Sequence, residues 1–372
     1  MFIHLNYTEK SHKALNNIKK YLTQNSDIIP INYKFYLTKG YPGNAKGYLY
    51  RDKRLEKSVK NIIESNLGYH VIIKRYQAYD NSLGLFDWPE HYAIKLLNVD
   101  GVLSTGNNIF MFFPEVLGIN TENIADYFGF EFVDAWVSVF DKVVFPCIKQ
   151  TFCLDSQYQF YQHLNSELEH TIYLASIFHE IGHRVSCWKV SPAKHPQVSL
   201  SKFHTDIMGE LSTDTLLVNL LPEFPELGYF VLAQRLFWFG RKGFSSNHLS
   251  GAINQDNDAW IGSYLWNKSC KIGCIEFIPE SKKLILNAAK IIPLFSLILE
   301  DLNQLGLEVI NASPGNQDMI VHQWLCKNLE FVDNQFILPT QFRNVLAACI
   351  NICETPAYDP KIIFESSNSV VA

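Results

Sequence analysis

The residues best suited to chemistry are two histidines and a glutamate in the pattern His179-Glu180-x-x-His183. Residues four apart on an α-helix are related by one turn and only about 40° of rotation, so the two imidazoles project side by side and can bind one metal ion. Glu180 lies about 100° around the helix from His179, where it can reach a water next to that ion without being a ligand. The metal then acts as a Lewis acid and the glutamate as a general base. The pattern therefore indicates the chemistry of a zinc hydrolase.

The segment around this pattern is expected to be a helix with one apolar face. Leu174, Phe178, Ile181 and Val185 recur at the period of an amphipathic helix. The two histidines fall on a different stripe, which suits a role in binding. The alternative interpretation is a pair of histidines that only form hydrogen bonds within a core.

An expected second helix, at about 205–221, carries an acidic stripe. Asp206, Glu210 and Asp214 repeat every four residues, so they lie along one side of the helix, next to an apolar stripe. A zinc ion bound by two histidines needs a third protein ligand and keeps a fourth position for water. Glu210 can supply that ligand, and His204 or Asp206 are alternatives. An ordinary solvated acidic face is the other interpretation.

Together, His179-Glu180-x-x-His183 and the downstream Glu210-x-x-x-Asp214 resemble the motifs of the gluzincin group of zinc metallopeptidases. The resemblance implies that His179, His183 and Glu210 bind one zinc ion. It also implies that Glu180 is the general base. Asp214 would then orient His179 by accepting its other ring N–H.

Signatures of narrower families are missing from the sequence. Ser186 and Lys189 stand where the metzincin continuation needs glycine and histidine. The Gly-x-Met-Glu-Asn segment of the thermolysin-related aminopeptidases and the double-glycine signature of dipeptidyl-peptidase III are absent as well. The motifs therefore leave the substrate open between a peptide and a small amide.

A gluzincin usually also needs a donor that stabilises the oxyanion of the tetrahedral intermediate. His248 and Tyr264 are the first candidates, because they lie on a loop and a helix that could fold back over the metal. Further candidates downstream of the motif are Arg235, Arg241 and His322.

The pattern of elements predicts an α+β fold. We expect an N-terminal mixed α/β-sheet region with antiparallel strands over 1–155, followed by a mainly α-helical, zincin-like region over 156–372 that carries the metal site. Expected elements include a strand at 69–76 and a helix at 281–304. A strand within 109–113 could hold an extended substrate at a sheet edge.

Composition narrows the partners and the compartment. The formal charge is −5 and no basic block compensates it, which argues against nucleic-acid or anionic-membrane partners. Residues 1–13 contain no apolar segment, so the sequence predicts no secretory signal and a cytoplasmic location.

The chain contains eight cysteines, and we expect them to be reduced thiols. An alternative is a second zinc site built from Cys270, Cys274, Cys349 and Cys353, although their spacing of four is not Cys-x-x-Cys. Small buried hydrophobic side chains are the interpretation that we favour.

The sequence thus predicts a zinc-dependent metallohydrolase that cleaves a peptide or a related amide bond. One alternative is a tailoring enzyme that uses the same metal on a small-molecule amide. Another is a non-catalytic protein that keeps the metal for stability. Two histidines and a carboxylate also suit ferrous iron, but two histidines on one helix turn, with a glutamate directly after the first, favour zinc.

Overall fold

The chain forms two compact units. The first unit comprises Met1–Lys60, Pro89–Ser138 and Thr355–Ala372, and the second comprises Asn61–Trp88 and Val139–Glu354. The division near residue 155 stays a prediction; by compactness the chain changes unit after Lys60, Trp88, Ser138 and Glu354. This computed structural model describes residues 9–36, 42–79, 90–101, 111–112, 128–185, 198–246, 251–253 and 256–352.

A five-stranded mixed sheet organises the first unit. Its strand order is β1-β2-β3-β5-β4, and neighbouring strands are antiparallel except for the parallel pair β3 and β5. The strands are β1 (Ile28–Tyr36), β2 (Pro42–Arg51), β3 (Glu90–Gly101), β4 (Met111–Phe112) and β5 (Phe128–Phe132). The strand expected within 109–113 is therefore an edge strand at 111–112, and its other three positions lie outside the described residues.

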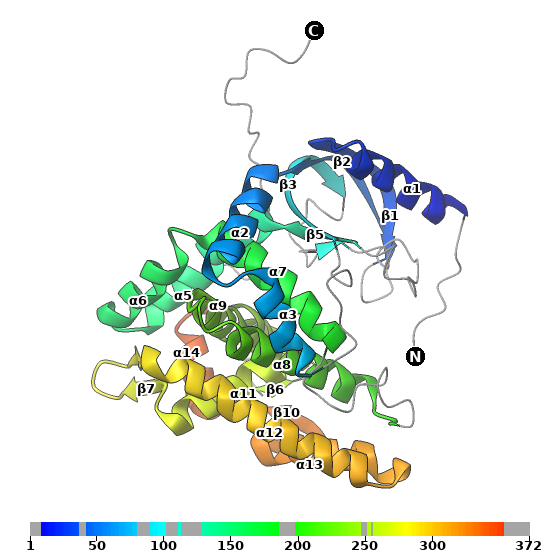
Figure 1. Ribbon diagram of the computed structural model, residues 1–372. Helices are drawn as coiled ribbons and strands as arrows, with labels where there is room; N and C mark the ends of the chain where they lie inside the picture. Colours follow the sequence, from blue (N-terminus) through cyan, green and yellow to red (C-terminus); the bar gives the residue numbers. More distant parts are fainter. Residues whose placement is uncertain are drawn as a thin grey trace. The chain divides into compact units, whose positions relative to one another are not determined.

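The core of the first unit lies between this sheet and helix α1 (Glu9–Thr23), which runs beside β1 and β2 in Figure 1. Ala14, Leu15 and Ile18 share one face of α1 and are buried against the sheet. Ile29 and Ile31 of β1 meet them, because alternate residues of a strand point to the same face. Helices α2 (Lys53–Asn66) and α4 (Val133–Val139) continue across the sequence boundaries between the units.

The second unit is mainly helical. Its α-helices are α3 (Tyr69–Gln77), α5 (Phe145–Thr151), α6 (Leu154–Leu164), α7 (Leu168–Val185), α8 (Lys202–Leu220), α9 (Glu226–Gln234), α10 (Arg241–Ser246), α11 (Asn257–Ile272), α12 (Ile291–Asn311), α13 (Gln317–Asn328) and α14 (Thr340–Ala347). Two π-helical segments are η3 (Phe140–Val144) and η4 (Arg235–Gly240), and two short 3₁₀ segments are η5 (Ala288–Lys290) and η6 (Pro314–Asn316). The fold class is therefore α+β, as the sequence predicts.

Two small sheets complete the second unit. The strands β6 (Ala252–Ile253), β10 (Gln335–Ile337) and β9 (Phe331–Val332) pair in that order, and β7 (Ile275–Ile278) pairs with β8 (Lys283–Leu286). Both pairings of β10 and the pair β7–β8 are antiparallel.

The strand expected at 69–76 is wrong, because this segment is helix α3. Ile72, Ile73 and Tyr76 are buried, which is the spacing of one helical face. The Tyr76 hydroxyl donates to the carbonyl oxygen of Phe178 at 3.3 Å. The segment is rich in β-branched and aromatic residues, which favour strands locally, but packing of the helical face overrides that preference.

The helix expected at 281–304 is partly wrong. Its first residues form strand β8, in which Leu284 and Leu286 are buried and Ile285 between them is exposed. Helix α12 starts only at Ile291, and Pro293 fits in its first turn, where a backbone N–H has no intrahelical partner. The long apolar run hid this change from strand to helix, because such a run has no clear period.

Helices α7 and α8 approach each other closely at Gly182. A Cβ atom at this position would lie 2.8 Å from Cγ2 of Thr213 and 3.2 Å from its Cα. A larger residue would therefore push the helices apart. Because α7 carries the two histidines and α8 carries Glu210, this contact determines how near the three side chains come.

Replacing Gly182 by alanine is expected to lower the free energy of unfolding by about 1–3 kcal/mol, the usual cost of overpacking. The better helix propensity of alanine offsets only about 0.5–1 kcal/mol of this loss. Urea unfolding measures the effect, and Gly315→Ala is the control, because a Cβ there meets nothing within 4 Å. Equal stability of the two variants would contradict the close approach.

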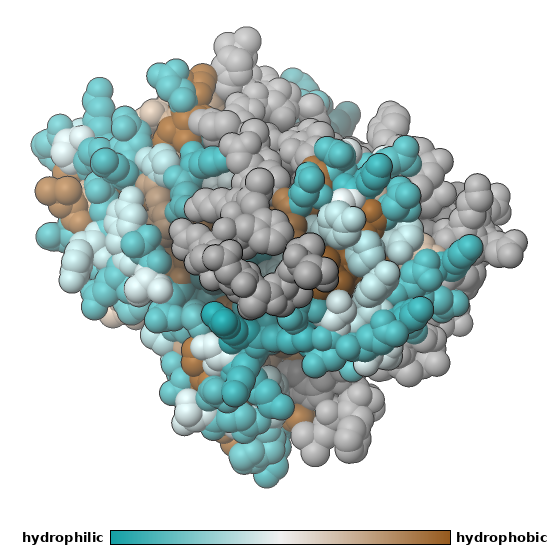
Figure 2. All heavy atoms as spheres, turned by 90° about the horizontal axis from the view of Figure 1, so that it is seen from above, coloured by the Kyte–Doolittle hydropathy of each residue, from teal (hydrophilic) through white to brown (hydrophobic). Residues whose placement is uncertain are grey.

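On the face that Figure 2 shows, the coloured side chains are mostly hydrophilic, with smaller hydrophobic areas among them. In the described ranges, no helix combines the length and the apolar character needed to cross a membrane.

Candidate metal centre

Helices α7 and α8, drawn in shades of green in Figure 1, carry the predicted metal-binding residues. The predicted apolar stripe of α7 is buried along its whole length. The histidine pair lies on the other face, where the side chains of His179 and His183 are 18% and 33% exposed. Burial of one face thus holds the helix in place and leaves the histidines accessible.

The nitrogen and oxygen atoms of three side chains converge here. Nε2 of His179 lies 3.1 Å from Nε2 of His183. One carboxylate oxygen of Glu210 lies 3.5 Å from the first of these nitrogens, and the other oxygen lies 3.4 Å from the second. The two helices therefore bring together the three residues that the sequence predicts as ligands.

These separations fit a tetrahedral zinc ion. Ligand atoms about 2.0–2.1 Å from a tetrahedral zinc lie about 3.3 Å from one another. The two nitrogens lie 3.1 Å apart and each has its own Glu210 oxygen at 3.4–3.5 Å, so every nitrogen–donor separation is close to that value. Two imidazole nitrogens and one carboxylate oxygen are also the donor types that zinc binds most often. The donor set therefore fits a zinc ion in both chemistry and spacing.

The other ring nitrogens of the two histidines also have partners on α8. Nδ1 of His179 lies 3.3 Å from Oδ1 of Asp214, and Nδ1 of His183 lies 3.3 Å from Oγ1 of Thr213. The Thr213 hydroxyl donates to the Gly209 carbonyl, so its oxygen can accept from His183. Protons on both Nδ1 atoms satisfy these contacts and leave both Nε2 lone pairs free to bind a cation. The resemblance to gluzincins implies such a contact for Asp214, whereas nothing in the sequence pointed to Thr213.

The electrostatics of this group favour a positive charge beside the two carboxylates, at His179. Burial lowers the pKa of His179, but its contacts with Asp214 and Glu210 outweigh burial and raise the pKa to about 10. Burial raises the pKa of Glu210, yet His183 and His179 bring it well below its ordinary value, so Glu210 is ionised. The carboxylates thus stabilise a cation at this point, which is the field that a metal site requires.

A buried arginine connects three acidic side chains around the site. Arg235 is 2% exposed, and its guanidinium group donates to Asp214 at 2.6 Å, to Glu210 at 2.8 Å and to Asp258 at 2.5 Å. Burial opposes the charge of Arg235, but these three carboxylates raise its pKa above the ordinary value. The arginine therefore fixes both Glu210 and the carboxylate that contacts His179.

The backbone around Arg235 explains how it reaches these partners. Arg235 is the first residue of η4, and this segment packs against α11, which carries Asp258. A Cβ atom on Gly262 of α11 would lie 2.4 Å from the Arg235 carbonyl oxygen, so only glycine allows the approach. Burial raises the pKa of Asp258 to about 6 despite the opposing charge of Arg235.

Glu180 occupies the expected position beside the histidines. It offers a carboxylate oxygen within 4.8 Å of their ligand atoms and is partly exposed. Glu210 faces the imidazoles with both oxygens, one 3.5 Å from His179 and the other 3.4 Å from His183. The carboxylates of Glu180 and Glu210 thus both lie next to the histidine pair.

The structure gives Tyr264 an environment that does not fit the expected oxyanion role. Its side chain is fully buried, and its hydroxyl donates to Asp301 of α12 at 3.0 Å. Trp260 stacks on its ring with centroids 5.2 Å apart. The hydroxyl therefore serves the packing of α11 on α12. The other first candidate, His248, lies outside the described residues.

The alternative ligands and oxyanion donors have other partners. The ring of His204 contacts Asp318 at 2.7 Å, and Asp206 pairs with Lys202 at 2.5 Å. Arg241 donates to the carbonyl oxygens of Cys349 and Ile352. His322, the remaining oxyanion candidate, lines a separate cavity with His204. None of these contacts brings the four side chains to the histidine pair.

The cysteines within the described ranges are free thiols. Burial raises the pKa of Cys270 to about 11 and that of Cys274 to about 12, so both are protonated. In this part of the chain no cysteine belongs to a cluster of three metal-binding side chains. Cys353, a member of the alternative zinc site, lies outside the described residues.

Comparison with known proteins adds a likeness of fold. No protein-family model and no curated protein sequence matches the chain. A solved structure of DPP III from Caldithrix abyssi is similar with a TM-score of 0.54 and 11% identity, over 89% of this chain and 59% of that one. The structure of dipeptidyl-peptidase III from Corallococcus sp. strain EGB is similar with a TM-score of 0.55 and 11% identity, over 96% of this chain and 66% of that one.

At this identity the likeness concerns the fold alone. The chain spans less than two thirds of the length of either structure.

Proposed function

We propose that this protein is a zinc-dependent peptidase of the gluzincin type. The observation that carries the proposal is the convergence of two histidine Nε2 atoms and the Glu210 carboxylate at separations of 3.1–3.5 Å. The likeness of fold to two dipeptidyl-peptidase III structures supports a peptide as the substrate.

His179, His183 and Glu210 would hold the zinc ion. A zinc ion bound there supplies a Lewis acid and makes water a stronger acid. Asp214 and Thr213 orient the two imidazoles through their Nδ1 atoms, which keeps the Nε2 lone pairs directed at one point.

Glu180 would carry the proton transfer. Its carboxylate lies one residue from His179 on the same helix, within 4.8 Å of the ligand atoms. A carboxylate in this place can accept a proton from the attacking water and give it to the nitrogen of the leaving group. It thereby serves as base in the first step and as acid in the second.

Metal removal tests the proposal. Element analysis of the purified protein is expected to find one zinc per chain, and a chelator should abolish peptide hydrolysis and lower the melting temperature, with both restored by added zinc. Hydrolysis that survives metal removal would contradict the proposal. Iron in place of zinc would change the metal assignment.

A ligand variant provides the matched control. His183→Ala is expected to weaken zinc binding by more than about 100-fold, since loss of an outer partner alone costs about 10–100-fold. The control is His163→Ala, which removes an imidazole of α6 that stacks on Tyr229 of α9 with centroids 4.2 Å apart. This variant should leave zinc binding unchanged. Equal zinc affinity of the two variants would contradict the ligand assignment.

A further inference from the structure

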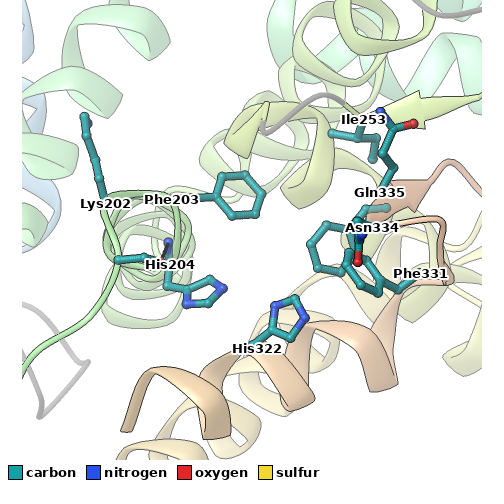
Figure 3. A pocket seen from close by; sticks show the side chains of 10 residues that line it. Lys202, Phe203, His204, Ile253, His322, Phe331, Asn334 and Gln335 are labelled. Atoms are coloured by element: carbon teal, nitrogen blue, oxygen red, sulfur yellow. Dashed lines mark hydrogen bonds between the residues drawn. The ribbon is translucent and has the colours of Figure 1, made fainter. Parts of the chain in front are cut away.

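A cavity of about 620 Å³ lies at the N-terminal end of α8, between that helix, α13 and the β9–β10 hairpin. Its size is that of sites for small molecules or for one or two residues of a peptide. Figure 3 shows Phe203 and His204 projecting from α8 toward His322 and Phe331 on the other side. All of these elements belong to the second unit.

The walls of the cavity are aromatic. Phe331 and Phe336 of the hairpin have ring centroids 4.8 Å apart, and Phe336 lies 6.1 Å from Phe203 of α8. The ring of His322 meets Phe331 edge to face at 5.0 Å. Aromatic rings arranged in this way bind another flat ring by stacking and edge contacts.

One nearly buried polar atom faces this aromatic box. The His204 side chain is 7% exposed, and its Nδ1 lies 2.7 Å from Oδ1 of Asp318. Asp318 accepts from Nδ1, so in the neutral ring of His204 the other nitrogen, Nε2, is a hydrogen-bond acceptor. The His204 ring lies 5.6 Å from the ring of His322 across the cavity. The cavity therefore combines aromatic walls with a directed acceptor.

The charges around the cavity favour an uncharged ligand. Asp318 also accepts the backbone N–H of Ser201 at 2.7 Å, so a carboxylate already occupies the N-terminal end of α8. Lys202 is paired with Asp206. Burial lowers the pKa of His322, which favours its neutral imidazole. A neutral ring with an O–H or N–H donor suits this set of groups, and a second anion does not.

The cavity is connected to the candidate metal centre through α8. Phe203 precedes Glu210 by seven residues, so the two side chains leave the helix on the same side, about 10 Å apart along its axis. An extended peptide spans that distance with about three residues. A substrate whose scissile bond lies at the metal centre can therefore place a nearby side chain in the cavity.

We propose that this cavity is a specificity subsite that binds a tyrosine or tryptophan side chain of the peptide substrate. The ring packs against the phenylalanine side chains that line the cavity, and its O–H or N–H donates to Nε2 of His204. The inference rests on the proposed peptidase function for its role, but ligand binding by the cavity can be measured without any turnover.

Binding of small probes tests the cavity itself. N-acetyl-tyrosinamide is expected to bind about 3- to 10-fold more tightly than N-acetyl-phenylalaninamide, the usual effect of one net hydrogen bond. N-acetyl-leucinamide should bind more weakly than both. Calorimetry on the full chain measures all three. His204→Phe should remove the preference for tyrosine over phenylalanine. A leucine probe that binds as well as the tyrosine probe, or no binding of any probe, would overturn the proposal.

Kinetics test the role of the cavity as a subsite. Among peptides that differ only in one residue, those with tyrosine or tryptophan near the cleaved bond should have a kcat/KM at least 10-fold above their leucine counterparts. Phe336→Ala should reduce this ratio toward one. Val332→Ala is the control, because Val332 lies on the same hairpin, 43% exposed, outside the cavity.

The two proposals fail in different ways. Metal-dependent hydrolysis without any aromatic preference would overturn the subsite and leave the peptidase function intact. Tight binding of the tyrosine probe by a protein that hydrolyses no peptide would overturn the peptidase function, and with it the role of the cavity as a substrate subsite. If Phe336→Ala fails to fold, Phe203→Leu makes the same kinetic test with a smaller change.

Discussion

Replacing Glu180 by glutamine is expected to leave a folded, zinc-binding protein whose peptide hydrolysis is about 10²- to 10⁴-fold slower. Glutamine keeps the size and the hydrogen-bonding reach of the side chain, but its amide cannot accept the proton of the attacking water. The three side chains assigned to the metal, His179, His183 and Glu210, are untouched. Zinc content and melting temperature should therefore match those of the wild type.

The test compares zinc content, thermal unfolding and kcat/KM on the same preparations. Glu169→Gln is the matched control, because Glu169 lies in the first turn of the same helix, α7, and the change in charge is identical. Full activity of Glu180→Gln would place the base elsewhere. Loss of zinc from this variant would show that Glu180 is a ligand, which its position within 4.8 Å of both histidines allows.

The parts of the site that could be predicted from the sequence are those that depend on helix geometry alone. His179 and His183 lie on one helix turn, and Glu210 and Asp214 lie one turn apart on the next long helix, so spacing determines which side chains point the same way. The α+β class follows for a related reason, because short aromatic segments and long periodic segments are distributed unevenly along the chain.

The remaining parts depend on contacts between distant segments, which no spacing shows. Arg235 was one of several candidates for stabilising the oxyanion. Only the structure, in which η4 packs against α11, reveals its ion pairs with two carboxylates of α8 and one of α11. Thr213 lies between Glu210 and Asp214 without any motif to mark it. Tyr264 was a candidate because its helix could fold back over the metal, but its side chain is buried and its hydroxyl donates to Asp301 of α12.

The position of the cavity gives the same helix a second role. Glu210 and Asp214 in the middle of α8 contact the histidines, while Phe203 and His204 in its first turn line the aromatic cavity. A rigid helix thus sets the distance between the candidate metal centre and the proposed subsite. His204 was considered as a zinc ligand because it stands at the start of this helix. The sequence could not show that its ring contacts Asp318, which lies more than one hundred residues further on.

Replacing Arg235 by methionine is expected to have the largest effect on stability, a loss of about 3–5 kcal/mol in the free energy of unfolding. Removing one partner of a buried ion pair leaves the other charge without compensation. Asp214 is fully buried and loses a partner at 2.6 Å, and Glu210 and Asp258 lose theirs at the same time. Arg235→Lys keeps the charge but cannot donate to three carboxylates at once, so an intermediate loss is expected.

Zinc and a second substitution separate electrostatics from packing in this experiment. The Arg235→Met protein should gain more stability from added zinc than the wild type does, because a cation at the histidines offsets part of the exposed negative charge. The double variant Arg235→Met/Asp214→Asn should be more stable than Arg235→Met alone, since the second change removes the uncompensated buried carboxylate. A double variant that is as unstable as the single one, in urea unfolding at equal zinc concentration, would mean that Arg235 contributes through packing and not through its ion pairs.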